Sequence, residues 1–206
     1  GDPITVIMAK DLIHAFFPEE DAGLKMNDYN KGDKKIPYKV IDEFPGTRLL
    51  DVRYEQLLDW VKPGEGAFRI VAGDFVTTEE GTGIVHTAPT FGADDLKVAR
   101  ENKLPALLVR LHDGFMSPLV DKQGRMVPIE DMDPAFVEKF VNEDTYKPFA
   151  GKYVKNEYSD ELGDKDDTLD IDIAVNLKQD GKAFRIEKYV HNYPHCWRTD
   201  KPVLYY

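Results

Sequence analysis

At 206 residues, with 42% hydrophobic residues, the chain is long enough to bury one sizeable core and is typical of a soluble globular protein. Its 38 acidic and 27 basic residues give a formal net charge of -11, which disfavours tight binding to nucleic acid by this chain alone, because most of the surface repels a polyanion. A single cysteine, Cys196, excludes an intrachain disulfide and fits a cytoplasmic protein, and no apolar run is long enough to cross a membrane.

The first half of the chain contains mostly strand-like segments separated by turns. Five segments rich in β-branched and apolar residues predict strands, at residues 3–8, 36–44, 67–72, 75–78 and 82–87. The last two predict a hairpin, because Gly81 in the intervening turn can take the positive φ that such a connection demands. Residues 9–17 place apolar side chains at roughly helical intervals and predict a short helix.

Helices are predicted more clearly in the second half of the chain. Apolar spacing and flanking residues place them at residues 93–103, 134–141 and 169–179. Short strands are predicted at residues 107–111 and 184–190. Many short strands with a few helices between them predict an α+β or barrel-like arrangement, not a regular β-α-β alternation.

The sequence also indicates the domain organisation. No internal repeat and no clear second domain are visible, so we expect residues 1–206 to form a single domain. The chain begins without a methionine and ends within the apolar run Val203-Leu204-Tyr205-Tyr206. We therefore expect it to be part of a longer protein.

Covalent and phosphate-binding chemistry find little support. The two serines, Ser117 and Ser159, both lie outside a Gly-x-Ser-x-Gly motif. Cys196 could act as a thiolate beside His195, but without a wider triad we expect a buried, inert cysteine. No glycine-rich turn is followed by the Gly-Lys-Ser or Gly-Lys-Thr of a phosphate-binding loop.

Metal binding is also disfavoured. Asp164 and Asp166 are spaced as at the start of a calcium loop, yet the glycine and the final glutamate of such a loop are missing. His191 and His195 are four residues apart like a zinc pair, but Pro194 prevents the continuous helix that would put both rings on one face. We expect no metal site and structural roles for both histidines.

One segment, residues 81–95, carries most of the functional argument. It reads Gly-Thr-Gly-Ile-Val-His-Thr-Ala-Pro-Thr-Phe-Gly-Ala-Asp-Asp. His86 comes near the end of a predicted strand, and Pro89 halts that strand so that the following residues can start a helix. Functional side chains are often found at such strand ends, so His86 is a candidate site residue.

The helix that follows presents two acidic residues in its first turn. Asp95 is four residues from both Phe91 and Ala99, so its carboxylate is expected on the side that the helix buries, while Asp94 points elsewhere. A partly buried carboxylate can receive a substrate ammonium group, and a nearby imidazole can orient or deprotonate a water. Because helix-start acids and strand-end histidines are also common structural features, a purely structural reading stays open at this point.

The motif resembles a known family. Residues 81–95 are similar to the signature of the editing domain inserted into isoleucyl-tRNA synthetases, and His-Asn-Tyr-Pro-His-Cys-Trp-Arg, at residues 191–198, resembles the segment by which that domain returns to the synthetase body. The related valyl and leucyl enzymes usually lack this histidine and the Ala-Pro-x-Phe-Gly that follows. The resemblance extends in weaker form through residues 60–68 and covers nearly the whole chain, with residues 190–206 as the return segment.

The resemblance implies a fold and an activity. The fold is an antiparallel β-barrel-like core with peripheral helices. The activity is proofreading: valine wrongly esterified to isoleucine tRNA is hydrolysed at a second site, because a missing methylene gives only modest discrimination, a limit for which this synthetase is itself a standard example. The parent enzyme would ligate isoleucine to its tRNA using ATP and Mg²⁺, whereas this chain would need no cofactor. Its partners would be mischarged isoleucine tRNA and the remainder of the synthetase, in the cytoplasm and away from membranes.

The resemblance also implies roles for residues of the motif. Asp95 would hold the α-ammonium of the misattached valine, and His86 would place the terminal ribose or the attacking water. Thr87, Phe91 and Gly92 would complete the substrate-binding surface. No covalent intermediate is implied, since an activated ester needs mainly a positioned water and charge complementarity.

The sequence also departs from the family's pattern. The family's editing pocket uses a threonine-rich Thr-Thr-Thr-Pro-Trp-Thr segment that is absent here and would lie before Gly1. The His-Ile-Gly-His and Lys-Met-Ser-Lys-Ser signatures of the synthetic site are absent as well. We therefore expect weak or undetectable deacylation by this chain alone. Two alternatives are a structural or tRNA-docking fragment that has lost its chemistry, and an unrelated acidic β-rich binding module.

Overall fold

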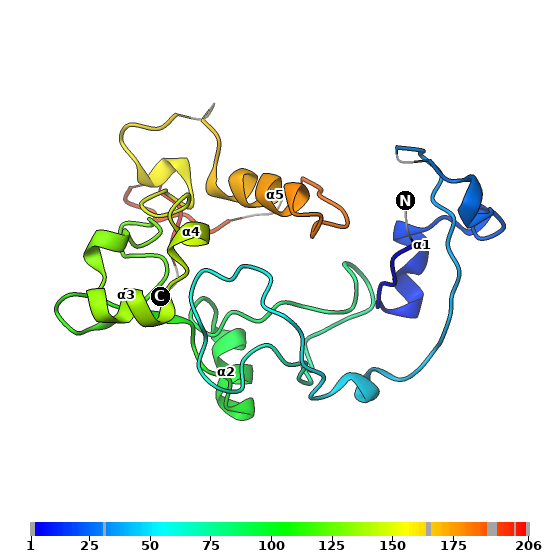
Figure 1. The fold of residues 1–206 in the computed structure, drawn as a ribbon, viewed down its shortest axis with the longest axis horizontal. Helices are drawn as coiled ribbons and strands as arrows, with labels where there is room; N and C mark the ends of the chain where they lie inside the picture. Colours follow the sequence, from blue (N-terminus) through cyan, green and yellow to red (C-terminus); the bar gives the residue numbers. More distant parts are fainter. Residues whose placement is uncertain (1–2, 31, 164–165, 189–192, 200, 205–206) are drawn as a thin grey trace. The chain divides into compact units, whose positions relative to one another are not determined.

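The computed structural model describes residues 3–30, 32–163, 166–188, 193–199 and 201–204 of the chain (Figure 1). It divides into two compact units. Unit 1 comprises Gly1–Arg53 and Arg69–Thr87, and unit 2 comprises Tyr54–Phe68 and Ala88–Tyr206. The prediction that all 206 residues form one domain stays a prediction.

Regular structure is sparse in unit 1 and denser in unit 2. Unit 1 holds α1 (Ile13–Phe16) and four short 3-10 helices, at Lys10–Leu12, Glu19–Asp21, Met26–Asp28 and Gly46–Leu49. Unit 2 holds α2 (Ala93–Asn102), β1 (Leu108–Arg110), β2 (Met116–Pro118), α3 (Pro134–Phe140), α4 (Glu143–Tyr146) and α5 (Leu169–Gln179), with 3-10 helices at Ile129–Asp131 and Asn156–Tyr158. None of the helices in the described part of the chain has the length and apolar character that a membrane span requires.

The strands predicted for the first half of the chain are wrong. Residues 3–8, 36–44, 75–78 and 82–87 form no strand, and residues 67–72 contribute only an isolated antiparallel bridge between Arg69 and Arg53. A strand forms only when its backbone pairs through several consecutive residues with a neighbouring segment. The composition of one segment indicates which side chains favour a strand, but it does not show whether such a neighbour is present. The predicted helix at residues 9–17 is confirmed in shortened form by the 3-10 turn and α1.

The predicted helices of the second half are confirmed to within a residue at each end. Helix α2 ends because Lys103 adopts a left-handed conformation, with φ 55°. Helix α3 begins after Asp133, whose carboxylate accepts the backbone N–H of Phe136 at 2.9 Å, with a proline in the first turn. A left-handed residue therefore ends α2, and a side-chain cap begins α3.

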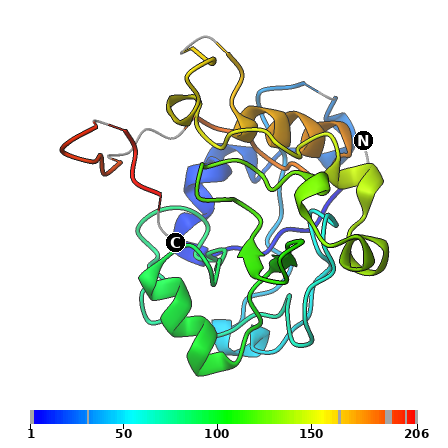
Figure 2. The same ribbon diagram turned by 90° about the vertical axis from the view of Figure 1, so that its left-hand side faces the viewer.

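The single sheet of the described residues is the antiparallel pair β1 and β2, which Figure 2 shows as two adjacent arrows. Its register pairs Leu108 with Pro118 and Arg110 with Met116. The strand predicted at residues 107–111 is confirmed, but residues 184–188 form no strand, and residues 189 and 190 lie outside the described residues. The fold is mixed α+β, and its sheet does not close into a barrel, so the predicted antiparallel β-barrel-like core is wrong for the described residues: two three-residue strands are far too few to close.

Unit 2 contains a hydrophobic core to which α3, α4, α5 and the β hairpin contribute. Its buried members are Trp60, Val61, Val109, Leu119, Met126, Val127, Met132, Val137, Tyr146, Phe149 and Leu169. The ring of Trp60 lies 4.8 Å from that of Phe149, and 6.1 Å from that of Tyr146. The Tyr146 hydroxyl donates to the carbonyl of Val127 at 2.7 Å, and burial raises the pKa of this phenol, so it stays a donor.

Replacing Tyr146 with phenylalanine should destabilise unit 2 by about 1–3 kcal/mol, because the buried carbonyl of Val127 would lose its hydroxyl donor. Urea denaturation monitored by the fluorescence of buried Trp60 measures this loss. The matched control is Tyr54→Phe, since the ring of Tyr54 is half exposed and its hydroxyl has no hydrogen bond to the described residues. Equal stabilities of the two variants would contradict a structural role for the buried hydroxyl.

Candidate functional site

The Gly-Thr-Gly turn that precedes His86 packs against the N-terminal segment within unit 1. The N–H of Ala9 donates to the carbonyl of Thr82 at 2.8 Å. Gly83 has φ 74°, and a Cβ at this position would lie 2.5 Å from the Cβ of Ala9. Only glycine fits such a close approach, so this glycine fixes the turn from which the chain runs to His86.

His86 lies in an extended segment of unit 1 and is exposed, while Thr87 is half-buried. The imidazole of His86 makes no hydrogen bond or ion pair with any other described residue. Its ring nitrogens can therefore contact a ligand or a water without breaking an internal interaction.

The start of α2 confirms the predicted register of the acidic pair. A turn precedes the helix, and within this turn the N–H of Phe91 donates to the carbonyl of Ala88 at 3.0 Å. Asp94 is exposed and Asp95 is half-buried. Ala99, one helical turn after Asp95, is 3% exposed, so Asp95 does lie toward the buried side of α2.

The carboxylate of Asp95 folds back onto the residue that begins the helix. A Cβ added to Gly92 would lie 2.7 Å from Oδ2 of Asp95. Gly92 is the N-cap of α2, and Asp95 is three residues further on. The carboxylate makes no hydrogen bond or ion pair with the described residues, so its charge is available to an external cation.

The structure brings only some of the predicted site residues together. Phe91, Gly92 and Asp95 belong to unit 2, and Gly92 and Asp95 are in contact. His86 and Thr87 belong to unit 1, so a site shared by His86 and Asp95 stays a prediction. Sequence reasoning named Gly92 for substrate binding and missed its contact with Asp95. The available signal was the N-cap to N3 spacing, at which a side chain reaches back to the helix start.

The described part of the return segment forms a local hairpin. His195 and Pro202 form an antiparallel bridge, and the N–H of Cys196 donates to the carbonyl of Lys201 at 2.9 Å. Cys196 is half-buried, so the predicted burial of this cysteine is wrong. Hydrogen bonds to its sulfur, first from the Thr199 side chain and then from backbone N–H groups of Arg198 and Thr199, lower the pKa of the thiol.

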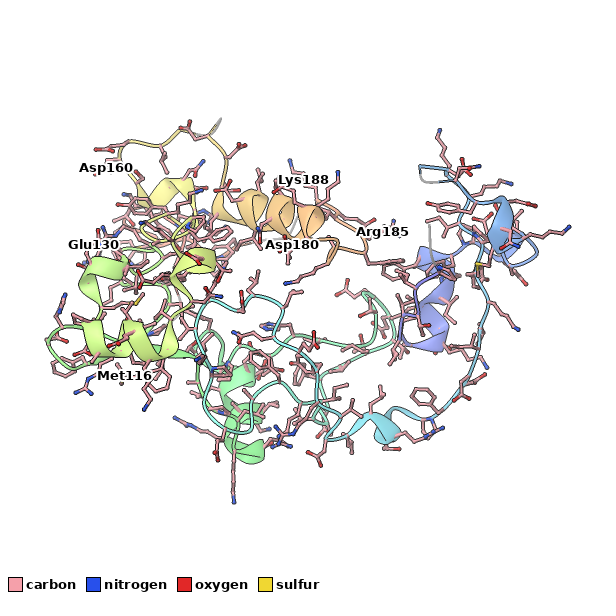
Figure 3. The ribbon with its side chains drawn as sticks, viewed as in Figure 1. Met116, Glu130, Asp160, Asp180, Arg185 and Lys188 are labelled. Atoms are coloured by element: carbon pink, nitrogen blue, oxygen red, sulfur yellow. The ribbon has the colours of Figure 1, made fainter. Side chains whose placement is uncertain are left out.

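Those candidate metal ligands that lie within the described residues do not form a metal site. Asp164 and His191 lie outside the described residues. Oδ2 of Asp166 accepts the N–H of Gly163 at 2.7 Å, and Asp160 lies in the same loop with an almost fully exposed side chain (Figure 3). Nδ1 of His195 lies 2.8 Å from the carbonyl of Tyr193. Across the described ranges, no group of three or more His, Cys, Asp or Glu side chains could hold a metal ion.

The relatives of this mixed α+β chain are aminoacyl-tRNA synthetases. The chain is homologous over its whole length to a segment of isoleucine–tRNA ligases. It is 53% identical over 206 residues to the enzyme of Bacteroides fragilis and 54% identical over 207 residues to that of Porphyromonas gingivalis, matching 100% of this chain and 18% of each relative. The ligase of Clostridium tetani is 37% identical over 169 residues, or 82% of the chain.

Two facts bound this comparison. No family model matches the chain. The chain spans only about 18% of the length of these ligases, so it corresponds to a small part of each.

Proposed function

We propose that this chain is the editing part of an isoleucine–tRNA ligase and that it hydrolyses valine misattached to isoleucine tRNA. The observation that carries the proposal is the half-buried carboxylate of Asp95, which has no internal hydrogen bond or ion pair among the described residues. Its position in residues 81–95, the segment that resembles the editing signature, connects this carboxylate with an ammonium-bearing substrate. The homology to isoleucine–tRNA ligases supports the choice of amino acid and tRNA.

The proposed reaction needs no covalent intermediate. Asp95 holds the α-ammonium of the misattached valine, which fixes the ester carbonyl relative to the water. His86 orients that water or the terminal ribose. Water adds to the carbonyl carbon and loses a proton, the bond between that carbon and the ribose oxygen breaks, and the released ribose oxygen takes up the proton to become a hydroxyl as valine leaves. Thr87 and Phe91 border the acyl group, Gly92 lies beside Asp95 at the start of α2, and the pocket rejects isoleucine by size.

The parent ligase supplies what this chain lacks. We assign ATP and Mg²⁺ to the synthetic site of the parent, whose His-Ile-Gly-His and Lys-Met-Ser-Lys-Ser signatures this sequence does not contain. The proposed partners are isoleucine tRNA carrying valine and the remainder of the ligase chain, in the cytoplasm. A threonine-rich segment of the parent, which we place before Gly1, contributes the other part of the editing pocket.

The test compares two proteins on tRNA charged with valine or isoleucine. One is the 206-residue chain, and the other is the same chain lengthened at its N-terminus through the threonine-rich segment. The lengthened chain should release valine much faster than isoleucine, and the 206-residue chain should release little of either. If the lengthened chain folds but releases valine no faster than buffer does, the chain is a structural or tRNA-docking segment. Rapid release by the 206 residues alone would show that the threonine segment is dispensable.

A further inference from the structure

We infer that Gly92 is a positioning residue for Asp95: its lack of a side chain holds open the place at the start of α2 that the ammonium-binding carboxylate occupies. The inference rests on the proposed function. It assigns Gly92 a role that acts through the carboxylate of Asp95, in place of direct contact with the valyl group.

The contact between the two residues leaves no room for a methyl group. A Cβ on Gly92 would lie 2.7 Å from Oδ2, 3.4 Å from Cγ and 3.6 Å from Cβ of Asp95. The first distance is shorter than any ordinary contact between carbon and oxygen, so the carboxylate would have to rotate away. Gly92 also has φ 155°, a conformation that residues with a side chain rarely adopt.

The backbone of Gly92 cannot readily move to relieve that clash. Its carbonyl accepts the N–H of Leu96 at 2.9 Å and thereby begins the hydrogen-bond pattern of α2. Helix α2 is in turn anchored by Val98 and Ala99, which are 7% and 3% exposed. A side chain at position 92 therefore displaces the Asp95 carboxylate, because the helix that follows Gly92 is held in place and the carboxylate is the end of a side chain that can rotate.

A displacement of the Asp95 carboxylate matters for the proposed chemistry. An ammonium ion held by one carboxylate is sensitive to the position of that charge, and a shift of about 1 Å is enough to lose much of the benefit of positioning. Substrates without an ammonium group gain nothing from Asp95. The effect of a side chain at Gly92 should therefore depend on whether the acyl group carries an amine.

The experiment uses full-length ligase and two esters of isoleucine tRNA, one with valine and one with 2-hydroxyisovalerate, which has a hydroxyl in place of the amine. Gly92→Ala should slow hydrolysis of the valyl ester at least about tenfold and leave the hydroxy ester within about twofold of the unmodified enzyme. The ratio of the two rates does not depend on the folded fraction. The matched control is Gly151→Ala, because Gly151 also has a positive φ, 76°, but nothing lies within 4 Å of the position that its Cβ would take. This control should leave the ratio unchanged.

The double variant completes the test. Gly92→Ala combined with Asp95→Ala should be no slower on the valyl ester than Asp95→Ala alone, since Gly92 acts through the carboxylate. The inference is overturned if Gly92→Ala keeps the ratio of the unmodified enzyme, or if the two substitutions have additive effects. If Gly92→Ala cannot be folded, Asp95→Glu moves the carboxylate by one methylene with Gly92 intact, and an unchanged ratio in that variant overturns the inference. Failure of the proposed function is separate, because Asp95→Ala alone would then leave the valyl ester unaffected.

Discussion

Replacing Asp95 with alanine in the full-length ligase should slow hydrolysis of valine from isoleucine tRNA by about 100-fold, or about 2.7 kcal/mol. The substitution removes the carboxylate that we propose as the partner of the valine ammonium. Because Asp95 is half-buried, its interaction with that ammonium is screened less than one between exposed charges. Steady-state hydrolysis of purified valyl-tRNA measures the effect, and isoleucylation of tRNA by the same preparation reports that the synthetic site is intact.

The neighbouring residue Asp94 provides the control. It carries the same charge in the same first turn of α2, but it is exposed. Asp94→Ala should alter hydrolysis less than about twofold, since it changes the helix-dipole interaction by a similar amount without touching the site. Equal losses in the two variants would mean that helix-start charge, and not an ammonium contact, explains the effect. No loss in either would remove Asp95 from the site.

Replacing Gly124 with alanine should destabilise unit 2 by about 3 kcal/mol, the largest stability effect that we predict for a single methyl group. Gly124 is buried, has φ 79°, and closes a turn in which its N–H donates to the carbonyl of Asp121 at 2.9 Å. A Cβ here would lie 2.9 Å from Cγ of Tyr158 and closer still to its Cδ2. Because Cγ is bonded to Cβ and stays in place when the ring rotates about that bond, ring rotation alone does not relieve the clash.

A comparison with Gly151→Ala separates the cost of backbone strain from the cost of the steric clash with Tyr158. Gly151→Ala adds a methyl group at a similar φ, 76°, where nothing lies within 4 Å, so it should cost only the conformational strain of about 1 kcal/mol. Urea denaturation monitored by Trp60 compares both variants with the unmodified chain. If Gly124→Ala is no less stable than Gly151→Ala, the packing of Tyr158 against this turn is not rigid.

Local sequence patterns were sufficient to predict helices and the register of side chains on them, because these depend on interactions between nearby residues. Helix α5 has the bounds that its apolar spacing predicts, and α3 begins at Pro134, directly after the capping residue Asp133. The register of Asp95 on α2 also followed from spacing, since one helical turn puts it in line with the buried Ala99. These features depend on residues within about four positions of each other.

The strand predictions, which depend on pairing between segments far apart in the sequence, were wrong in the first half of the chain. The segments at residues 3–8 and 36–44 have strand-like composition, yet Ile4 and Ile41 are 69% and 71% exposed and neither segment pairs. A hydrogen-bonded ladder needs a second segment at the right distance and register, which alternation within one segment does not encode. The barrel-like core depended on many such pairings, and for this reason it was the least accurate part of the prediction.

The sequence by itself determined the helical register of Asp95 and the homology to a segment of isoleucine–tRNA ligases, and residues 81–95 led to the editing proposal. Only the tertiary structure decided that the chain divides into two compact units, that the described residues form one short antiparallel pair of strands, and that Gly92 lies against the carboxylate of Asp95. The physical reason is the range of the interactions. Helix periodicity and caps act within a few residues, whereas strand pairing and side-chain packing depend on where the backbone places its partners.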